Sequence, residues 1–364
     1  MNNRKNRREC QSPHKLRRVV TLFCLLGFMD VMWSDSAVKK NPSWDTLKIK
    51  AVGDMVPGTL YPDNRTSLNP YEDFFAPLQT HLSDSDILFA NLETTLTHHS
   101  KTAKDTSRSL VFAFRTPPTM AEILKKVGFN VLSIANNHSL DFGEKGFADT
   151  ARYLRSAGLL AVGAKGQIAY QFFKKKKIAF IAFSTMRLHN RITELDTMRG
   201  LVKEARVNAD IVIVSCHWGG EGEKFLHTKN VTEVFYGENR GNLPQFAHAA
   251  IHAGADLILG HGPHVLRAME LYKNKLIVYS LGNFLGFGAL SSRGKTGLSA
   301  IVEVELKENG DFSVGRIIPL YMPEKSIPRF DPGGQSIQLI QKLSREDFPQ
   351  SQLNIADNGD LDLL

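Results

Sequence analysis

Short apolar runs alternate with amphipathic helical segments over residues 47–265. The runs contain few polar positions, which is typical of strands buried on both faces of a parallel sheet. Such strands, when helices separate them, predict an α/β fold. The predicted strands are 47–52, 87–90, 131–135, 210–216 and a run ending at 259, and the predicted helices are 74–82, 118–127, 144–157, 192–205 and 243–253.

The later part of the chain has the pattern of antiparallel strands. Paired apolar segments flank turn sequences at 273–275 and 308–311, and the second turn contains Asn309-Gly310, a strong hairpin signal. An earlier pair of segments flanks the basic run 174–177, which we interpret as a solvated turn. After Pro323 we expect a polar tail with one helix over 336–343. The predicted organisation is therefore one domain over 47–322 and a C-terminal extension over 323–364.

The N-terminal segment differs from the rest of the chain. Seven basic side chains within residues 1–18 precede an apolar run over 19–33 and then small residues. This pattern is typical of an export signal. The run is shorter than the roughly 20 residues of a comfortable membrane-spanning helix. That length favours a cleaved signal over 1–36, although an uncleaved membrane anchor also fits. Lipidation of Cys24 is less favoured, because only a short apolar stretch precedes it. We expect an exported protein of the cell envelope.

The leader also carries much of the charge. Without residues 1–36 the formal net charge falls from +8 to +4, because seven basic and three acidic side chains are removed. This balance argues against a nucleic-acid partner. Cys10 and Cys24 lie in the leader as well, so Cys216 has no partner for an internal disulfide in the exported domain.

Side chains that can bind metals follow the ends of the apolar runs. Strands of one sheet bring their carboxyl ends to the same edge, so such residues can share one cleft although they are distant in sequence. Oxygen ligands mixed with imidazoles suit Mn²⁺, Fe, Zn²⁺ or Mg²⁺. The set indicates two metal ions, the arrangement used for in-line displacement at phosphorus. Taken singly, each residue is also compatible with a turn. The candidates are Asp54, Glu93, Asn137, His138, His217, His261 and His264.

The stretch 130–146 carries the most varied chemistry. A strand ends in Asn136-Asn137-His138, and Asp141 follows before the next helix. An Asn offers a neutral oxygen to a metal, His138 can be a general acid or stabilise charge, and Asp141 can orient either group. Arg115 could clamp an anionic substrate through its planar guanidinium. An Arg beside aromatic side chains is also a common packing or ion-pair residue.

Several motifs occur in a fixed order within about 47–319, and their joint order is highly specific. They are Val52-Gly53-Asp54, Ala90-Asn91-Leu92-Glu93, Phe114-Arg115-Thr116-Pro117-Pro118, Ala135-Asn136-Asn137-His138 with Asp141 and Gly143, His217-Trp218-Gly219 with Glu221, Gly260-His261 with Pro263-His264-Val265, and Tyr279-Ser280-Leu281-Gly282-Asn283-Phe284. Together they resemble the capsule-synthesis proteins of the CapA type, which are linked to poly-γ-glutamate capsule formation and related to calcineurin-like metallophosphoesterases. The resemblance implies a four-layer α/β/β/α sandwich of the metallo-dependent phosphatase type.

The resemblance also implies roles for individual residues. Two departures concern the metal site. The Asp-x-His of ordinary metallophosphoesterases is here Asp54-Met55-Val56, and Asn91-Leu92-Glu93 stands where they usually have Gly-Asp. These departures leave open whether the site hydrolyses a substrate. The implied metal ligands are Asp54, Glu93, Asn137, His217, His261 and His264, and the implied catalytic imidazole is His138, with Asp141 and Arg115 as further catalytic candidates.

Three functional hypotheses follow. The first is an exported or membrane-anchored protein with a divalent-metal site that acts in synthesis or export of an anionic capsule polymer, alongside other capsule-synthesis subunits. The second is an exported metallophosphoesterase that acts on small phosphoesters and has no link to capsule. The third is a non-catalytic scaffold of the capsule machinery.

Overall fold

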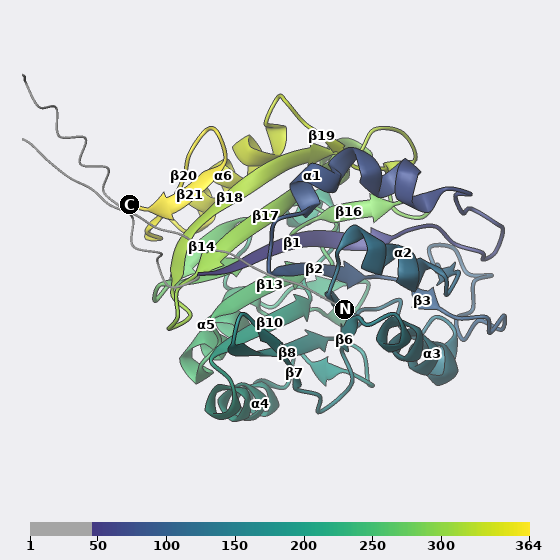
Figure 1. Ribbon diagram of the computed structural model, residues 1–364, viewed down its shortest axis with the longest axis horizontal. Coiled ribbons are helices and arrows are strands. Elements are labelled where there is room, and N and C mark those ends of the chain that lie inside the picture. The colour runs from purple at the N-terminus through teal and green to yellow at the C-terminus, as the bar shows by residue number, and fades with distance from the viewer. Residues whose placement is uncertain (1–45) are drawn as a thin grey trace, which may run out of the picture. The chain divides into compact units, whose positions relative to one another are not determined.

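The computed structural model describes residues 46–364. The predicted leader over 1–36 lies outside these residues. Two large mixed β-sheets pack against each other, and helices cover their outer sides (Figure 1). This arrangement is the predicted α/β/β/α sandwich. Within 46–364, none of the helices is both long and apolar enough to cross a membrane.

The ten-stranded sheet combines early and late parts of the chain. Its strand order is β20-β21-β18-β17-β1-β2-β5-β6, with β16 also paired to β1 and β19 to β18. β1, β2, β5 and β6 run parallel, as their buried apolar runs predict, and β17 and β18 form the predicted hairpin. The bounds are β1 (Leu47–Val56), β2 (Ile87–Leu92), β5 (Val131–Ser133), β6 (Leu160–Val162), β16 (Asn283–Gly286), β17 (Leu298–Leu306), β18 (Phe312–Tyr321), β19 (Arg329–Phe330), β20 (Leu353–Ile355) and β21 (Asp360–Leu363).

The seven-stranded sheet is formed by the middle of the chain. Its order is β14-β15-β13-β10-β8-β7, with β9 beside β8. The inner strands β8, β10, β13 and β15 are parallel, and β7 and β14 are antiparallel edge strands. Two small sheets pair β3 with β4 and β11 with β12. The bounds are β3 (Thr95–Leu96), β4 (Arg115–Thr116), β7 (Ala169–Phe173), β8 (Lys176–Ser184), β9 (Asn190–Arg191), β10 (Ile211–His217), β11 (Val234–Phe235), β12 (Glu238–Asn239), β13 (Leu257–His261), β14 (Met269–Tyr272) and β15 (Lys275–Val278).

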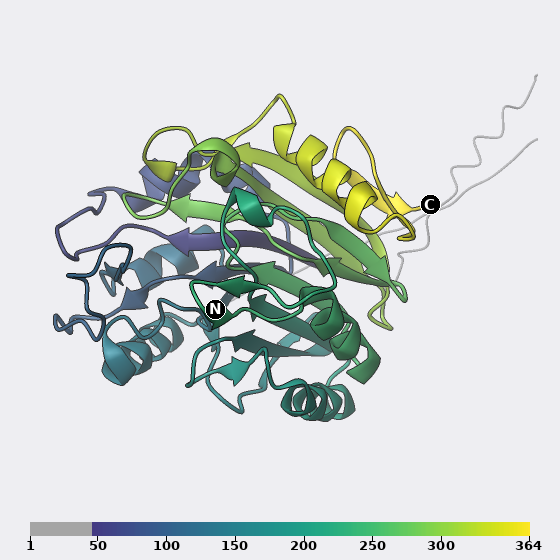
Figure 2. The ribbon, with the colours of Figure 1, turned by 180° about the vertical axis from the view of Figure 1, so that it is seen from behind.

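The helices cover the two sheets from opposite sides. The helical segment that ends in α1, together with α2 and α3, packs on the ten-stranded sheet, and α4 and α5 pack on the seven-stranded sheet. Figure 2 shows α6 alongside β17 and β18, and α6 also contacts β14. The bounds are η1 (Tyr71–Phe75), η2 (Ala76–Leu78), α1 (Gln79–Leu82), α2 (Met120–Val127), α3 (Gly143–Ser156), α4 (Leu195–Asn208), η3 (Glu223–Phe225), α5 (Leu243–Ala253), η4 (Gly294–Gly297), η5 (Glu324–Ser326) and α6 (Gln335–Asp347).

Alternate residues of the central strands enter different cores, because successive side chains of a strand point to opposite faces. In β2, Ile87 and Phe89 pack in the core between the sheets, whereas Leu88 and Ala90 pack beneath α2 and α3. β5 divides in the same way. The inner strands therefore need apolar residues at every position, which explains why they read as continuous apolar runs.

Two expectations from sequence are corrected. The metal-binding candidates follow strands of two sheets rather than one, since β1, β2 and β5 lie in the ten-stranded sheet and β10 and β13 in the other. The segment after Pro323 is more than a polar tail with one helix, because β20 and β21 extend the ten-stranded sheet. These strands escaped detection because they are short and mix polar with buried residues: in β21 only Leu361 is buried.

β1 changes partners at Gly53. Residues 47–52 pair with the antiparallel β17, whereas residues 54–56 pair with the parallel β16. The backbone N–H of Asp54 donates to the carbonyl of Gly282 at 2.9 Å. A Cβ atom at Gly53 would lie 2.0 Å from that same carbonyl oxygen, so only glycine permits this approach. The position of Asp54 therefore depends on a residue without a side chain.

We predict that Gly53→Ala lowers the free energy of unfolding by about 1–3 kcal/mol, because backbone rather than a flexible side chain must move. Gly200→Ala is the matched control, since Gly200 lies in α4 and a Cβ there has no neighbour within 4 Å. This control should raise the free energy of unfolding by about 0.5–1 kcal/mol through helix propensity. Urea unfolding of both variants tests the prediction, and equal effects of the two substitutions would contradict it.

Candidate metal centre

Strand register brings the predicted ligands together in pairs. Asp54 of β1 is opposite Asn91 of β2, which leads directly to Glu93, and His217 of β10 is opposite His261 of β13. The two pairs belong to different sheets, and His264 follows in the loop after β13. Residues from four separate stretches therefore meet where the two sheets face each other.

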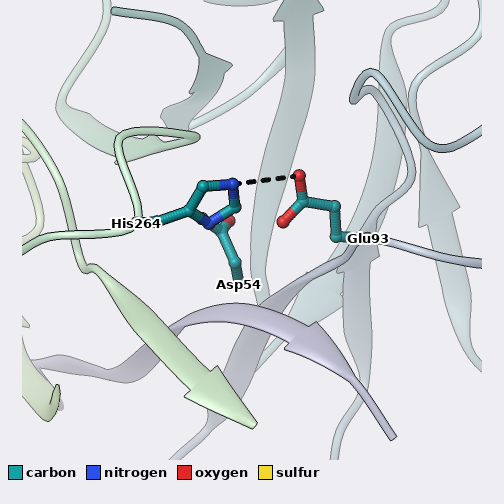
Figure 3. Close-up of side chains that lie close together, drawn as sticks. All are labelled: Asp54, Glu93 and His264. Carbon is teal, nitrogen blue, oxygen red and sulfur yellow. Dashed lines mark ion pairs between the residues drawn. The ribbon is translucent and has the colours of Figure 1, made fainter. Parts of the chain in front are cut away.

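Distances between the side chains define a compact group. Nε2 of His217 lies 3.0 Å from Oε1 of Glu93, and Nδ1 of His261 lies 3.7 Å from Oδ1 of Asp54. His264 lies between the two carboxylates, with Nδ1 3.2 Å from Oδ2 of Asp54 and Nε2 3.8 Å from Oε1 of Glu93 (Figure 3). One ligand atom from each of Asp54, Glu93 and His264 lies within 4.8 Å of the others. This spacing suits groups that share a cation.

Several atoms of this group are buried without a hydrogen-bond partner in the described part of the chain. They are both ring nitrogens of His261, Nδ1 of His217, Oε2 of Glu93 and Oδ1 of Asn137. Buried polar atoms are normally paired, and leaving one unpaired costs about 1–3 kcal/mol. Imidazole nitrogens combined with carboxylate and amide oxygens are suitable ligands for divalent Mn, Fe, Zn or Mg. The residues therefore fit a divalent-metal centre.

Burial and charge set the protonation of the group. Burial lowers the pKa of His261 to about 4, although Asp54 opposes the shift. This imidazole is therefore neutral at neutral pH, the form that binds metals. Burial alone would raise the pKa of Asp54, but the neighbouring His264 lowers it below its usual range. Burial would lower the pKa of His264, yet Glu93, Asp54 and Glu221 raise it well above the ordinary value. Binding of a metal ion at His264 would therefore release a proton.

His138 and Asp141 form a separate pair. Nδ1 of His138 lies 2.8 Å from Oδ2 of Asp141, which also accepts the backbone N–H of Phe114 at 2.6 Å. Nζ of Lys104 is 2.6 Å from the other carboxylate oxygen, and the Phe114 ring packs against the imidazole at a centroid distance of 4.4 Å. Asp141 therefore holds the imidazole by Nδ1 and leaves Nε2 for other partners. No sequence pattern singled out Lys104, which lies in an irregular loop.

Neutral amides connect this pair to the candidate metal-binding group. Nδ2 of Asn91 donates to Oδ1 of Asp54 at 2.8 Å, and Oδ1 of Asn91 accepts from Nδ2 of Asn136 at 3.0 Å. Oδ1 of Asn136 in turn accepts the backbone N–H of His138 at 3.1 Å. Neither Asn was among the predicted metal ligands, although Asn91 precedes Glu93 by two residues and Asn136 adjoins Asn137.

The contacts of Asn137 and Arg115 connect them less directly to the other candidate site residues. Asn137 follows β5 in the same loop as His138, and its Oδ1 is buried and unpaired in the described structure. The guanidinium of Arg115 lies 5.7 Å from the centre of the Phe142 ring, and Nη1 lies 3.4 Å from the carbonyl of His99. These contacts place Arg115 next to the residue that follows Asp141. Its predicted contact with an anionic substrate stays a prediction.

The loop after β13 is held by Asn283 and by a backbone N–H, neither of which was predicted to take part in the site. Nδ1 of His264 donates to Oδ1 of Asn283 at 2.8 Å, and Asn283 is opposite Asp54 in the β1–β16 register. Gly262 has φ +104°, a conformation that favours glycine, and its N–H donates to Oδ2 of Asp54 at 3.1 Å. The Gly-His-Gly-Pro-His sequence therefore supplies a backbone donor as well as two imidazoles.

A buried histidine also joins the two halves of the site. Nδ1 of His189 lies 2.6 Å from Oγ of Ser184 at the end of β8, and Nε2 lies 3.0 Å from Oγ of Ser139 in the loop after β5. The Ser139 hydroxyl is also 2.9 Å from the carbonyl of Asn136. His189 thus links the seven-stranded sheet to the loop that carries His138.

The four layers, with the candidate ligands at the facing strand ends, are those of the metallo-dependent phosphatase fold class. The family model described as "Bacterial capsule synthesis protein PGA_cap" matches residues 48–287, and the chain belongs to this family. The family predicted from sequence is therefore confirmed. The roles of the individual site residues stay predictions.

Known proteins are similar in sequence to most of this chain. The "PGA biosynthesis protein CapA" of Bacillus subtilis (strain 168) is 29% identical over 324 residues, covering 84% of this chain and 80% of the relative. The "Capsule biosynthesis protein CapA" of Bacillus anthracis is 29% identical over 305 residues, covering 78% of this chain and 69% of the relative. A solved structure of a putative 5′-nucleotidase from Staphylococcus aureus matches with 18% identity and a TM-score of 0.44, covering 81% of this chain and 58% of that one.

We predict that His189 makes folding stability depend on pH. Burial lowers the pKa of His189 from 6.5 to about 3, so between these values the unfolded chain binds a proton that the folded chain does not. The free energy of unfolding should therefore fall as the pH decreases from about 6.5 towards 3, by several kcal/mol at about 1.4 kcal/mol for each pKa unit.

Urea unfolding of wild type and His189→Asn between about pH 7 and pH 4 measures this contribution. The variant should lose less stability on acidification than the wild type. The exposed His252 of α5 provides a control with the same substitution, His252→Asn. An unchanged pH slope in His189→Asn would show that His189 is not the titrating group.

Proposed function

We propose that this protein holds divalent metal ions where its two sheets meet and acts at the cell envelope in the synthesis or export of an anionic capsule polymer of the poly-γ-glutamate type. Membership in the capsule synthesis family supports the capsule role, as do the names of the two Bacillus relatives. The basic and apolar pattern of residues 1–36 supports export or membrane anchoring. Other subunits of a capsule-synthesis assembly are the expected partners.

The observation that carries the metal proposal is the set of buried, unpaired ligand atoms at facing strand ends. A bound divalent ion would satisfy these atoms and would supply Lewis-acid chemistry at a phosphorus or acyl centre. The number of donors supports two ions. The residues that would hold them are Asp54, Glu93, Asn137, His217, His261 and His264.

His138 is the proposed proton-transfer residue. The carboxylate of Asp141 accepts from Nδ1, which fixes the tautomer and leaves Nε2 to donate to or accept from a reacting oxygen. The Phe114 backbone N–H and the Lys104 ammonium hold the carboxylate in place. The ring of Phe114 restricts the imidazole from one side. His138 therefore has the positioning that general acid catalysis at a leaving oxygen requires.

We predict that the purified full-length chain contains bound divalent metal and hydrolyses a model phosphodiester with Mn²⁺. His138→Ala should lower kcat about 10²–10⁴-fold, the usual contribution of a positioned proton donor. The metal content of this variant should match wild type, because His138 is not among the proposed ligands. Elemental analysis and turnover before and after chelation measure both quantities.

The same experiment separates catalysis from scaffolding. Turnover that disappears in His138→Ala while the metal remains excludes the scaffold. Bound metal without turnover would support a metal-containing scaffold. If wild type contains neither metal nor activity, the proposed metal centre is wrong.

We also predict that deletion of the chromosomal copy lowers the mass of secreted anionic polymer. Wild type supplied in trans should restore it, and His138→Ala should fail to do so if hydrolysis is needed for capsule formation. Restoration by His138→Ala would assign the capsule role to the scaffold instead. An unchanged polymer yield in the deletion strain would favour a phosphoesterase with no link to capsule.

A further inference from the structure

Glu221 brings a third carboxylate to the metal-binding group. Its Oε2 lies 3.9 Å from Nε2 of His264, nearly the same distance as Oε1 of Glu93 at 3.8 Å. Glu221 follows β10 in the loop that begins with His217-Trp218-Gly219, whereas Glu93 follows β2 in the other sheet. His264 therefore faces carboxylates from both sheets with the same nitrogen.

The orientation of His264 is fixed by the other side of its ring. Nδ1 donates to Oδ1 of Asn283, and Nδ2 of Asn283 lies 3.1 Å from the carbonyl of Ser291 and 3.4 Å from that of Thr296. These contacts determine which end of the Asn283 amide faces the imidazole. Nδ1 therefore keeps its hydrogen, and Nε2, once its proton is released, presents a lone pair on the side of Glu93 and Glu221.

The loop that carries Glu221 is held firmly. Nη2 of Arg240 pairs with Oε1 of Glu221 at 3.0 Å, which leaves Oε2 on the side of His264. The buried guanidinium of Arg267 makes paired contacts of 2.8 and 3.0 Å with the carboxylate of Glu233 and also donates to the carbonyl of Gly220. Glu233 in turn accepts the N–H of Gly220 at 2.6 Å. These contacts position a carboxylate rather than leave it on a free loop.

The distances from Nε2 of His264 to Glu93 and Glu221 suit ligands of one ion. Two donors that each lie about 2.0–2.2 Å from a metal can be at most about 4.4 Å apart, and both contacts to Nε2 of His264 are shorter. Oε2 of Glu93 is fully buried and unpaired in the described structure, so it offers a free donor atom in the same group. β1 contributes only Asp54 here, because the following Met55 and Val56 are buried and apolar.

We propose that Glu221 is a ligand of the metal ion bound by His264, together with Asp54 and Glu93. This assignment rests on the proposed metal centre. Three carboxylates and a single imidazole form an oxygen-rich position, which favours hard ions such as Mn²⁺ or Mg²⁺. The second proposed metal position, near His217 and His261, would have more imidazole donors. The two positions should therefore differ in metal preference.

The test compares Glu221→Gln with Glu238→Gln in the full-length chain. Glu238 is the matched control because it also pairs with Arg240, at 2.5 Å from Nε, but it has no contact with His264 in the described structure. Equilibrium dialysis and elemental analysis count bound Mn²⁺, and electron paramagnetic resonance reports on its surroundings. Near-UV circular dichroism checks that each variant is folded.

Wild type and Glu238→Gln should bind two Mn²⁺ per chain. Glu221→Gln should bind one Mn²⁺ unchanged and the second at least about 10-fold more weakly. Full binding by Glu221→Gln overturns the assignment but leaves the metal centre intact. Equal weakening in both variants overturns it too, because the Arg240 contacts would then be responsible. No divalent metal in wild type would reject the metal centre itself.

Discussion

The structure depends on how the buried carboxylate of Asp54 is stabilised. A carboxylate taken out of water needs hydrogen-bond donors or opposite charge on every side. The donors here are the Asn91 amide from β2 and the Gly262 N–H from the loop after β13, with the His264 imidazole close by. They come from both sheets, so stabilising this one group fixes the relative position of the strand ends that carry the other candidate ligands. The partner change of β1 at Gly53 makes this placement of Asp54 possible.

The sequence predicted those parts of the site that follow one repeated pattern, a polar residue at the end of a buried apolar strand. Each buried strand had to be apolar throughout, so a polar residue at its end, such as Asp54 or His217, stood out. The rule does not specify the sheet to which a strand belongs, because parallel strands buried on both faces have the same pattern. The pattern therefore predicted that these residues converge on one site. Periodicity could not predict that the site lies between two facing sheets.

The residues that hold the candidate site side chains in place were harder to predict, because they do not follow the strand pattern. Lys104 and Glu233 lie in loops, where no periodicity predicts the direction of a side chain, and Asn283 begins the short strand β16. Asn136 could have been singled out, since it lies beside two candidate residues, but its amide gives no sign of whether it binds a metal or another side chain. In the structure it donates to Asn91 and accepts from the backbone of His138. An amide suits this position because it can donate and accept at once, which neither a carboxylate nor an ammonium group can do.

Stability alone does not account for the polar residues at the junction of the sheets. Apolar residues of similar size would fill this space without unpaired donors and acceptors, and replacing buried charged groups in this way often stabilises a protein. Instead, His261 has two unpaired ring nitrogens, and Glu93 and His217 each have a further unpaired atom although they contact one another. Each unpaired atom costs about 1–3 kcal/mol, a large fraction of the 5–15 kcal/mol that stabilises a typical domain. A bound cation would offset several of these costs together, because one ion can satisfy donors from both sheets. The fold is therefore expected to gain stability from the same ions that the proposed chemistry requires.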